Sequence, residues 1–331
     1  MEGSSLAQSN QKATVSGLSV PRLYVTKLRG NEMMETAKLN GVELEYEVKG
    51  SGEPVLLIST GPIADSFLPF LSESVLVEHF RLISYRQRGQ AGSTRSATPV
   101  SHAEHAADAA ALLSYLGVRR AHVAGHSTGG CIALQLALVR PDLVQTLTLL
   151  EPPLPGVPSA SAFFEKAGPA LASYRSGNRE KAMAEFLSAV SSLDWETCRT
   201  VIEEHVPSGV AQAMKDADTF FGGYLPALDA WQFDPGEAAV ISQPVLSVLG
   251  TKTEPWFKDG QALLHTSFPQ VEELSVEGVG HLLHMQRPEP VARGVASFLG
   301  RHPITVADKG ASSAGRKGGS TFLRGVKAAT R

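Results

Sequence analysis

The sequence predicts an α/β fold, in which helices flank an eight-stranded, mostly parallel sheet and a helical cap is inserted. Three observations predict it. Strand-like apolar runs alternate with helical runs along most of the chain. From Val55 onward several of these runs are continuously apolar, as parallel strands covered on both faces should be. Between residues 159 and 233 the alternation stops and only helical patterns occur, which indicates an insertion.

The predicted strands follow one another along the chain. The first two form a hairpin about Asn40-Gly41, a dipeptide typical of two-residue turns. The eight predicted strands are Thr36–Leu39, Glu43–Val48, Val55–Ser59, Arg81–Tyr85, His122–Gly125, Thr146–Leu150, Val245–Leu249 and Glu272–Val276.

Helices are predicted between these strands. The helix over residues 101–116 begins with a capping box, Ser101 with Glu104, and ends before Gly117. Further helices are expected over residues 258–267 and 288–300. His102 and His105 lie in the first turn of the 101–116 helix. Because the local sequence offers no partners for a metal ion, we expect both rings on the solvated surface.

Four parts of the chain are expected. Residues 1–32 form a flexible N-terminal extension, and residues 33–152 with 236–302 form the α/β core. Residues 153–235 form the helical cap. Residues 303–331 form a flexible basic tail, because six Lys and Arg stand against one Asp among many small residues.

Composition narrows the classes of partner. The 331 residues carry a net charge of -3, with 43% hydrophobic and 19% charged residues, as in a globular protein. We therefore expect neither nucleic acid nor an anionic membrane surface as a partner.

The two cysteines, Cys131 and Cys198, suggest no disulfide framework. With no apolar signal region near the start, a cytoplasmic location is expected, and no cofactor or metal is predicted.

The strongest functional motif is Gly125-His126-Ser127-Thr128-Gly129, which fits the G-x-S-x-G nucleophile elbow. An apolar strand precedes it, and a helical run follows until Pro141. The two glycines leave room where strand and helix approach closely. The motif predicts that Ser127 is presented at the top of the sheet as a nucleophile. The alternative is a buried serine in a glycine-rich turn.

Two further segments carry a family resemblance. The stretch from Arg86 to Ser93 looks like the D-x-R-G-x-G-x-S turn of the α/β-hydrolase superfamily, with Arg86 where an aspartate is common. Gly278-Val279-Gly280-His281 looks like the loop that presents that family's catalytic histidine. With the elbow and the inserted helices, the chain resembles this superfamily over roughly residues 35–302.

The resemblance implies a catalytic triad. Ser127 would be the nucleophile and His281 the base that takes its proton, with His284 as a second choice. The acid has two candidate positions. Glu151 ends the sixth strand, a position used by haloalkane dehalogenases and some lactonases of the superfamily. Glu254 follows the seventh strand but stands one residue beyond the usual aspartate position. We choose Glu151, because the end of a strand holds a side chain more rigidly than a loop does.

An oxyanion hole would need two backbone N–H groups. The resemblance implies that one comes from Thr128, the residue after the nucleophile. The other should come from the loop after the third strand, where this chain has Ser59-Thr60-Gly61-Pro62 in place of the usual His-Gly-x. Proline has no N–H. Gly61 is therefore the predicted donor, with Ile63 as the alternative.

These residues lead to one expected function and two alternatives. The expected protein is a serine hydrolase that cleaves an uncharged, largely apolar carboxylic ester or lactone through an acyl-enzyme. The same groups would serve a cofactor-free haloperoxidase or perhydrolase, or a C–C hydrolase. A ligand-binding protein of the same fold without useful turnover is the third possibility. The sequence names neither the substrate nor the oligomeric state.

Overall fold

The computed structural model describes residues 34–305. The expected flexible extension at 1–32 lies outside the described residues, and so does most of the expected tail at 303–331. Residues 303–305 are described, and Ile304 is buried with its N–H donating to the Glu53 carboxylate at 2.9 Å. The fold of the described residues therefore extends slightly beyond residue 302, where we placed the boundary.

The eight predicted strands are all present, with ends that differ from the predicted ones by two residues at most. Their order across the sheet is β1-β2-β4-β3-β5-β6-β7-β8. The pairs β1–β2 and β2–β4 are antiparallel and the remaining pairs are parallel, which confirms the predicted fold class. The strands are β1 (Glu35–Leu39), β2 (Val42–Lys49), β3 (Glu53–Ile58), β4 (Phe80–Tyr85), β5 (Ala121–His126), β6 (Val144–Leu150), β7 (Val245–Gly250) and β8 (Glu272–Val276).

Helices fill the connections, and the three predicted in the core are present. Among the described residues the α-helices are α1 (Ser74–Val77), α2 (His102–Tyr115), α3 (Thr128–Val139), α4 (Ala160–Arg175), α5 (Arg179–Ser191), α6 (Trp195–His205), α7 (Gly209–Lys215), α8 (Ala217–Thr219), α9 (Leu225–Ala230), α10 (Pro255–Ser267), α11 (Leu283–Gln286) and α12 (Pro288–Arg301). Short 3₁₀ turns are η1 (Phe70–Ser72), η2 (Pro141–Leu143) and η4 (Glu237–Val240), and η3 (Phe220–Tyr224) is a π-helical turn.

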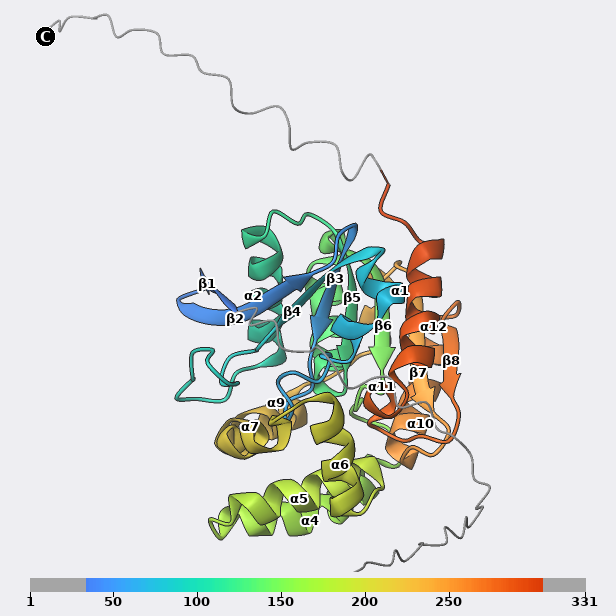
Figure 1. Ribbon diagram of the computed structural model, residues 1–331. Helices are drawn as coiled ribbons and strands as arrows, with labels where there is room; N and C mark the ends of the chain where they lie inside the picture. The colour runs from blue at the N-terminus through green and yellow to red at the C-terminus, as the bar shows by residue number, and fades with distance from the viewer. Residues whose placement is uncertain (1–33, 306–331) are drawn as a thin grey trace, which may run out of the picture. The chain divides into compact units, whose positions relative to one another are not determined.

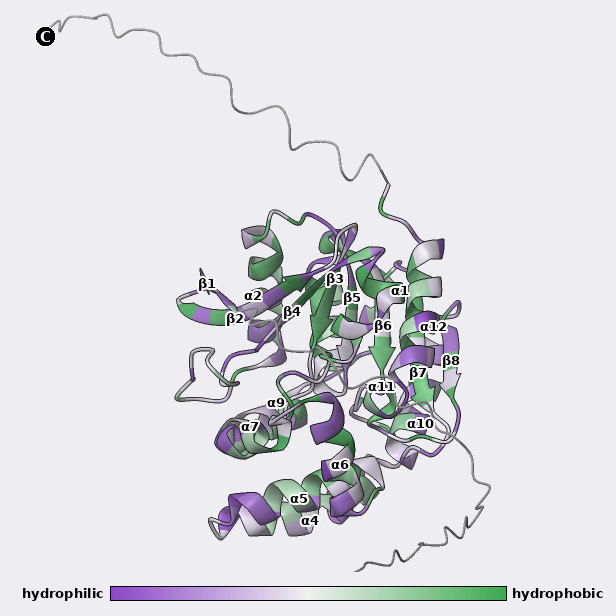
Figure 2. Ribbon diagram, viewed as in Figure 1, coloured by the Kyte–Doolittle hydropathy of each residue, from purple (hydrophilic) through white to green (hydrophobic). Residues whose placement is uncertain are grey.

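The sheet is covered on both faces, because alternate residues of each central strand point to opposite sides. On β3, Leu56 and Ile58 pack with α2 and α3, whereas Val55 and Leu57 pack with α1 and α12. Figure 2 shows the central strands β3, β5 and β6 in the colour of hydrophobic residues, as parallel strands buried on both faces require.

Between β6 and β7 the described residues form helices joined by loops, with no strand, as expected, and supply α4 to α9. In Figure 1 these helices lie beyond the end toward which the arrow of β6 points. In open α/β sheets, ligands bind at the carboxyl ends of the strands. The helical segment therefore lies over the edge of the sheet where a site is expected.

Two histidine expectations were wrong. His102 and His105 are 2% and 3% exposed instead of lying on the surface. The ring of His102 stacks on Trp231 at 5.1 Å between centroids, and that of His105 stacks on Tyr224 at 5.0 Å. The sequence could not show that the inserted helices return across the first turn of α2 and bury both rings.

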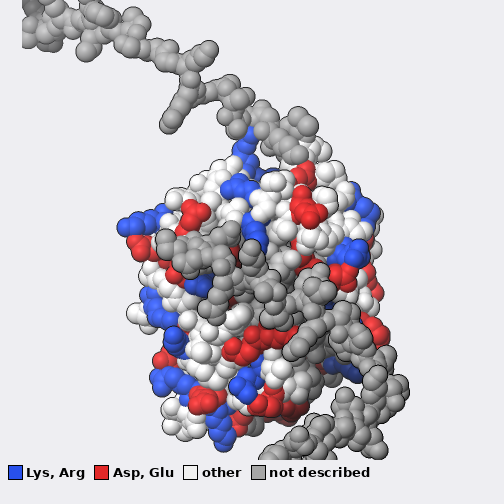
Figure 3. Space-filling view, viewed as in Figure 1, with Lys and Arg blue, Asp and Glu red and all other residues white. Residues whose placement is uncertain are grey.

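The surface carries both signs of charge. On the face seen in Figure 3, Lys and Arg side chains and Asp and Glu side chains are both present, scattered among uncharged residues. No helix of the described chain combines the length and the apolar character that a bilayer-spanning segment needs.

Candidate active site

Ser127 stands in a strained turn between β5 and α3. Its backbone φ of 55° with ψ of −127° is a conformation that side-chain-bearing residues rarely adopt. A Cβ at Gly125 would lie 2.3 Å from the carbonyl oxygen of Gly129, and one at Gly129 would lie 2.2 Å from that of Ile58. Only glycine fits at both positions, so the elbow predicted from G-x-S-x-G is present in its geometry.

Glu151 and His281 form a buried pair. Glu151 follows the last residue of β6, and one of its carboxylate oxygens, Oε2, accepts a hydrogen bond from His281 Nδ1–H at 2.8 Å. That bond sets the tautomer, which leaves the lone pair on Nε2. Burial lowers the pKa of His281, so the imidazole is a neutral base near pH 7.

Further donors hold the Glu151 carboxylate in place. The Gly250 N–H donates to Oε1 and the Thr253 hydroxyl donates to Oε2, each at 2.8 Å. Burial raises the pKa of Glu151, while these two hydrogen bonds lower it. Thr253 stands three residues after Gly250, where the family's more common acid would be, and it supports the carboxylate from β6 instead.

Glu254, the other candidate acid, faces elsewhere. Its carboxylate accepts hydrogen bonds from Lys166 Nζ at 2.6 Å and from the Ser192 hydroxyl. It therefore links the start of α10 to the inserted helices. Of the two glutamates weighed from the sequence, the structure brings Glu151 to His281.

His126 ties the loop of His281 to the elbow. Its Nε2–H donates to the backbone carbonyl of His281 at 2.9 Å, and the two rings lie 4.7 Å apart. On its other side the His281 ring stacks on Phe257, with centroids 4.1 Å apart and planes 12° apart. His284, the second choice for the base, is fully buried and donates to the Ser66 carbonyl at 2.8 Å. It is held in the core and makes no contact with Glu151.

The loop after β3 is held by two buried glutamines from the loop after β4. Gln87 Nε2 donates to the Ser59 carbonyl at 2.7 Å. Gln90 Nε2 donates to the carbonyls of Thr60 and Gly61, at 3.0 and 2.9 Å. Since the carbonyls of this loop are fixed in place, its N–H groups are fixed as well.

Gly61, the predicted second oxyanion donor, lies beside the elbow and has a partner. Its N–H donates to Thr128 Oγ1 at 2.8 Å. The Thr128 N–H is the first of α3 and has no acceptor within the helix. A Cβ at Gly61 would come within about 3.0 Å of the Tyr224 ring, so the inserted helices also press on this loop.

A small apolar cavity opens above Ser127. Its volume is about 20 Å³, which is room for roughly one water molecule. Among its lining residues only Ser127 and Thr128 have hydroxyl groups; the others are aromatic, aliphatic or proline, namely Pro62, Pro153, Phe163, Phe164, Phe186, Val190, Phe220, Leu225, Leu228, Trp256 and Phe257.

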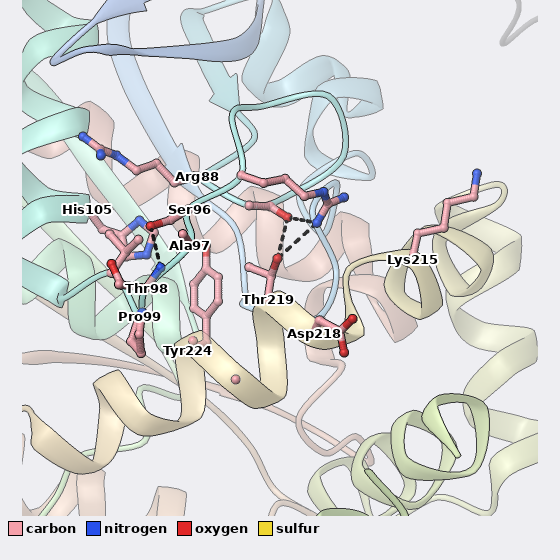
Figure 4. Close-up of a pocket in the computed structure, with 15 residues that line it drawn as sticks. Arg88, Ser96, Ala97, Thr98, Pro99, His105, Lys215, Asp218, Thr219 and Tyr224 are labelled. Carbon is pink, nitrogen blue, oxygen red and sulfur yellow. Dashed lines mark hydrogen bonds between the residues drawn. The ribbon is translucent and has the colours of Figure 1, made fainter. Parts of the chain in front are cut away.

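A larger cavity of about 540 Å³ lies elsewhere, between the loop after β4 and the turn η3. Figure 4 shows Tyr224 rising from η3 toward His105, with Lys215 directed away from them. The arginines along it are already paired, Arg88 with Asp108 and Arg95 with Asp216. Ser127 is absent from this lining but lines the smaller cavity, so we place the candidate site at the smaller cavity.

Arg86, which departs from the family's aspartate, makes an ion-pair network outside the site. Its guanidinium donates to both carboxylate oxygens of Asp65 at 2.9 Å and to Glu45 at 2.6 Å. These carboxylates raise its pKa above the ordinary value, although burial lowers it. Arg86 therefore braces β4 against β2 and the loop after β3.

Comparison with known proteins gives the family. A family model described as alpha/beta hydrolase fold matches residues 53–288. The chain belongs to this family. The matched residues include the elbow at Ser127, Glu151 and His281.

Individual relatives match over shorter stretches. A protein of Azorhizobium caulinodans named "Putative carbamate hydrolase RutD" is 39% identical over 109 residues, which are 33% of this chain and 40% of that protein. A protein of Mycobacterium tuberculosis named "Putative non-heme bromoperoxidase BpoC" is 33% identical over 110 residues, which are 33% of this chain and 42% of that one. The matched stretches thus span about two fifths of these relatives.

Solved structures agree with the fold. The enol-lactonase of Burkholderia xenovorans LB400 has a TM-score of 0.67 with 22% identity, and the alignment covers 80% of this chain and all of that one. At that identity, the similarity shows a shared fold.

Four residues of the site were not found from the sequence. They act by hydrogen bonds to parts of the chain distant in sequence, and they are Thr253, His126, Gln87 and Gln90. His126 stands inside the elbow motif, and Thr253 occupies the family's more common acid position. Both positions were visible in the sequence, but their partners were not.

Proposed function

We propose that the protein is a serine hydrolase that cleaves uncharged, apolar carboxylic esters or lactones through an acyl-enzyme. The observation that carries this is the buried Glu151–His281 hydrogen bond of 2.8 Å beside the strained elbow of Ser127. A serine hydroxyl, a carboxylate and an imidazole in this chain order are the groups that acyl transfer needs.

Each group has a role in the proposed reaction. Ser127 Oγ attacks the acyl carbon while its proton passes to Nε2 of His281, and Glu151 stabilises the imidazolium that forms. The developing oxyanion is stabilised at the Thr128 N–H, beside the loop that carries Gly61. His281 then gives the proton to the leaving alcohol, and water repeats the sequence on the acyl-enzyme.

The cavity supports an apolar, uncharged substrate. The side chains around Ser127 are mostly aromatic or aliphatic, with none carrying a charge. Burying a charged substrate group there without a partner would cost several kcal/mol or more. At about 20 Å³ the cavity is closed around Ser127, so binding requires side chains of the inserted helices, such as Phe220 and Phe164, to move apart.

The test is covalent labelling of Ser127. An apolar fluorophosphonate should label wild-type protein at Ser127, and Ser127→Ala should lower kcat for p-nitrophenyl butanoate by at least about 10⁴-fold. Ser247→Ala is the control, because Ser247 is a buried serine on β7 outside the cavity lining, and it should keep wild-type turnover. Equal turnover by Ser127→Ala and wild type would end the proposal.

A second candidate is peroxide-dependent halogenation by the same three groups. The name of the mycobacterial relative, a putative non-heme bromoperoxidase, favours testing it. Turnover of p-nitrophenyl butanoate should exceed bromination of monochlorodimedone with peroxide under the same conditions. The opposite ranking would support the second candidate. Tight binding of apolar esters with no product would instead support a ligand-binding protein.

A further inference from the structure

The hydrogen bond between Gly61 and Thr128 bears on how an oxyanion is stabilised here. In the structure the Gly61 N–H is directed at Thr128 Oγ1, 2.8 Å away, and both residues are buried. An N–H held in this bond is not free to donate to a substrate oxygen. The donor predicted from the sequence is therefore already engaged by the side chain of the other predicted residue.

The Thr128 hydroxyl can still donate a hydrogen bond. A hydroxyl group can accept a hydrogen bond and donate one at the same time. Thr128 Oγ1 accepts from Gly61, and none of the described residues is found to accept its own proton. The side chain is 4% exposed and lines the cavity above Ser127. The unused proton is thus beside the proposed nucleophile, in an apolar space.

Accepting the Gly61 N–H makes this hydroxyl a better donor. Hydrogen bonds in a chain polarise one another, and the low dielectric of a buried site strengthens each of them. The hydroxyl can turn without moving the backbone. Thr128 also carries the first free N–H of α3, at the positive end of the helix. One residue can therefore present two donors to the same oxygen.

We propose that the Thr128 hydroxyl is a catalytic donor to the oxyanion, and that Gly61 acts through it. The proposal rests on the proposed acyl-enzyme reaction. As the bond from Ser127 Oγ to the acyl carbon forms, the carbonyl electron pair moves onto the substrate oxygen. The serine proton goes to His281, and Thr128 keeps its own proton while donating a hydrogen bond.

In the opposite role, the Thr128 hydroxyl would block the position of the oxyanion. If the hydroxyl merely occupied the place of the oxyanion, substrate would have to displace it before Gly61 could donate. Removing the hydroxyl would then free the Gly61 N–H and raise the rate. The two roles therefore predict changes of opposite sign for a variant that lacks only the hydroxyl.

The experiment compares hydroxyl-free with hydroxyl-bearing residues at position 128. Thr128→Val keeps the shape and the backbone N–H, Thr128→Ala removes the hydroxyl with less bulk, and Thr128→Ser restores the hydroxyl. Thr146→Val is the matched control, because Thr146 is fully buried and its Oγ1 also has a single partner at 2.8 Å, His122 Nδ1, away from the cavity. Each full-length protein is assayed with p-nitrophenyl butanoate and with an apolar trifluoromethyl ketone, which forms a tetrahedral adduct.

We expect kcat to fall about 100-fold in Thr128→Val and Thr128→Ala, with little change in KM, as for loss of one oxyanion donor. Affinity for the ketone should fall by a similar factor, whereas Thr128→Ser should stay within about fivefold of wild type and Thr146→Val should equal it. A kcat that is unchanged or raised in Thr128→Val or Thr128→Ala overturns the proposal. If wild type shows no turnover dependent on Ser127, the proposed function itself fails, and that result is seen before any Thr128 variant is compared.

Discussion

At the scale of single residues, the pairing of Glu151 with His281 is the feature on which the proposed chemistry depends most. Glu151 has a backbone φ of 47° and is almost fully buried, so its place at the strand end costs conformational and solvation energy. The hydrogen bonds from Gly250, Thr253 and His281 offset that cost. A carboxylate held this firmly can keep one tautomer of the imidazole.

The first prediction separates the two candidate acids. Glu151→Gln should lower kcat by about 10³ to 10⁴-fold, because a neutral amide no longer fixes the tautomer or stabilises the imidazolium. Glu254→Gln is the control and should stay within about twofold, since Glu254 contacts Lys166 and Ser192 instead. Steady-state kinetics on an apolar ester measure both variants. A larger loss for Glu254→Gln would reverse the assignment.

At the scale of elements, the site consists of strand ends held together by loops. The loops after β3 and β4 meet through Gln87 and Gln90, and the turn η3 joins them through Tyr224, whose hydroxyl donates to Gln87 Oε1 at 2.9 Å. The inserted helices are thus linked through Gln87 to the loop that carries Gly61.

The second prediction concerns this glutamine support. Gln90→Glu replaces a donor with a carboxylate oxygen facing the carbonyls of Thr60 and Gly61, and it should lower kcat about tenfold or more by displacing the loop. Gln145→Glu is a matched control, since Gln145 Nε2 also donates to two consecutive carbonyls, those of His302 and Pro303. Gln90→Glu, at a fully buried position, should lose more stability in urea unfolding than Gln145→Glu at a partly exposed one. Only Gln90→Glu should lose rate under conditions in which both variants are folded. Equal kcat in both would contradict the role of Gln90.

At the scale of the whole molecule, an unusual number of histidines are buried in the neutral form. Burial lowers the pKa of each of six histidines in the described chain: His102, His105, His122, His126, His281 and His284. The values for His102 and His105 fall to about 3 and about 4. In the unfolded chain these rings would titrate near 6.5.

The third prediction follows from the sign of these shifts. Between pH 6.5 and about 4 the unfolded state binds protons that the folded state does not, so stability is lost as pH falls. Each ring contributes up to about 1.4 kcal/mol per pH unit. Glu151, whose pKa burial raises, acts with the opposite sign but is a single group. Urea unfolding at pH 7, 6 and 5 should show a steadily falling free energy of unfolding.

His102→Phe tests the origin of this slope. The phenyl ring keeps the stack on Trp231 but cannot bind a proton, so the fall in stability between pH 6 and 5 should become smaller. His79→Phe serves as the comparison, because His79 is exposed, and its slope should match that of wild type. Identical slopes for all three proteins would show that buried histidines do not set the pH dependence.

The sequence by itself determined the order of strands and helices, the elbow at Ser127 and the place of His281. These features depend on short-range patterns. Alternating apolar runs, paired glycines and a capping box each involve only a few neighbouring residues, so they can be recognised without the structure. The choice of Glu151 over Glu254 was made from the sequence on a general argument about stiffness. Only tertiary structure showed which of the two reaches His281.

Tertiary structure also decided what covers and supports the site. The burial of His102 and His105, the bonds from Gln90 to the loop of Gly61, and the engagement of Gly61 by Thr128 all join segments distant along the chain. Hydrogen bonds and packing of this kind depend on where the inserted helices and the strand ends meet. Residue type and spacing show which reactive groups this protein has. The three-dimensional contacts decide which of these groups lie close enough to act together.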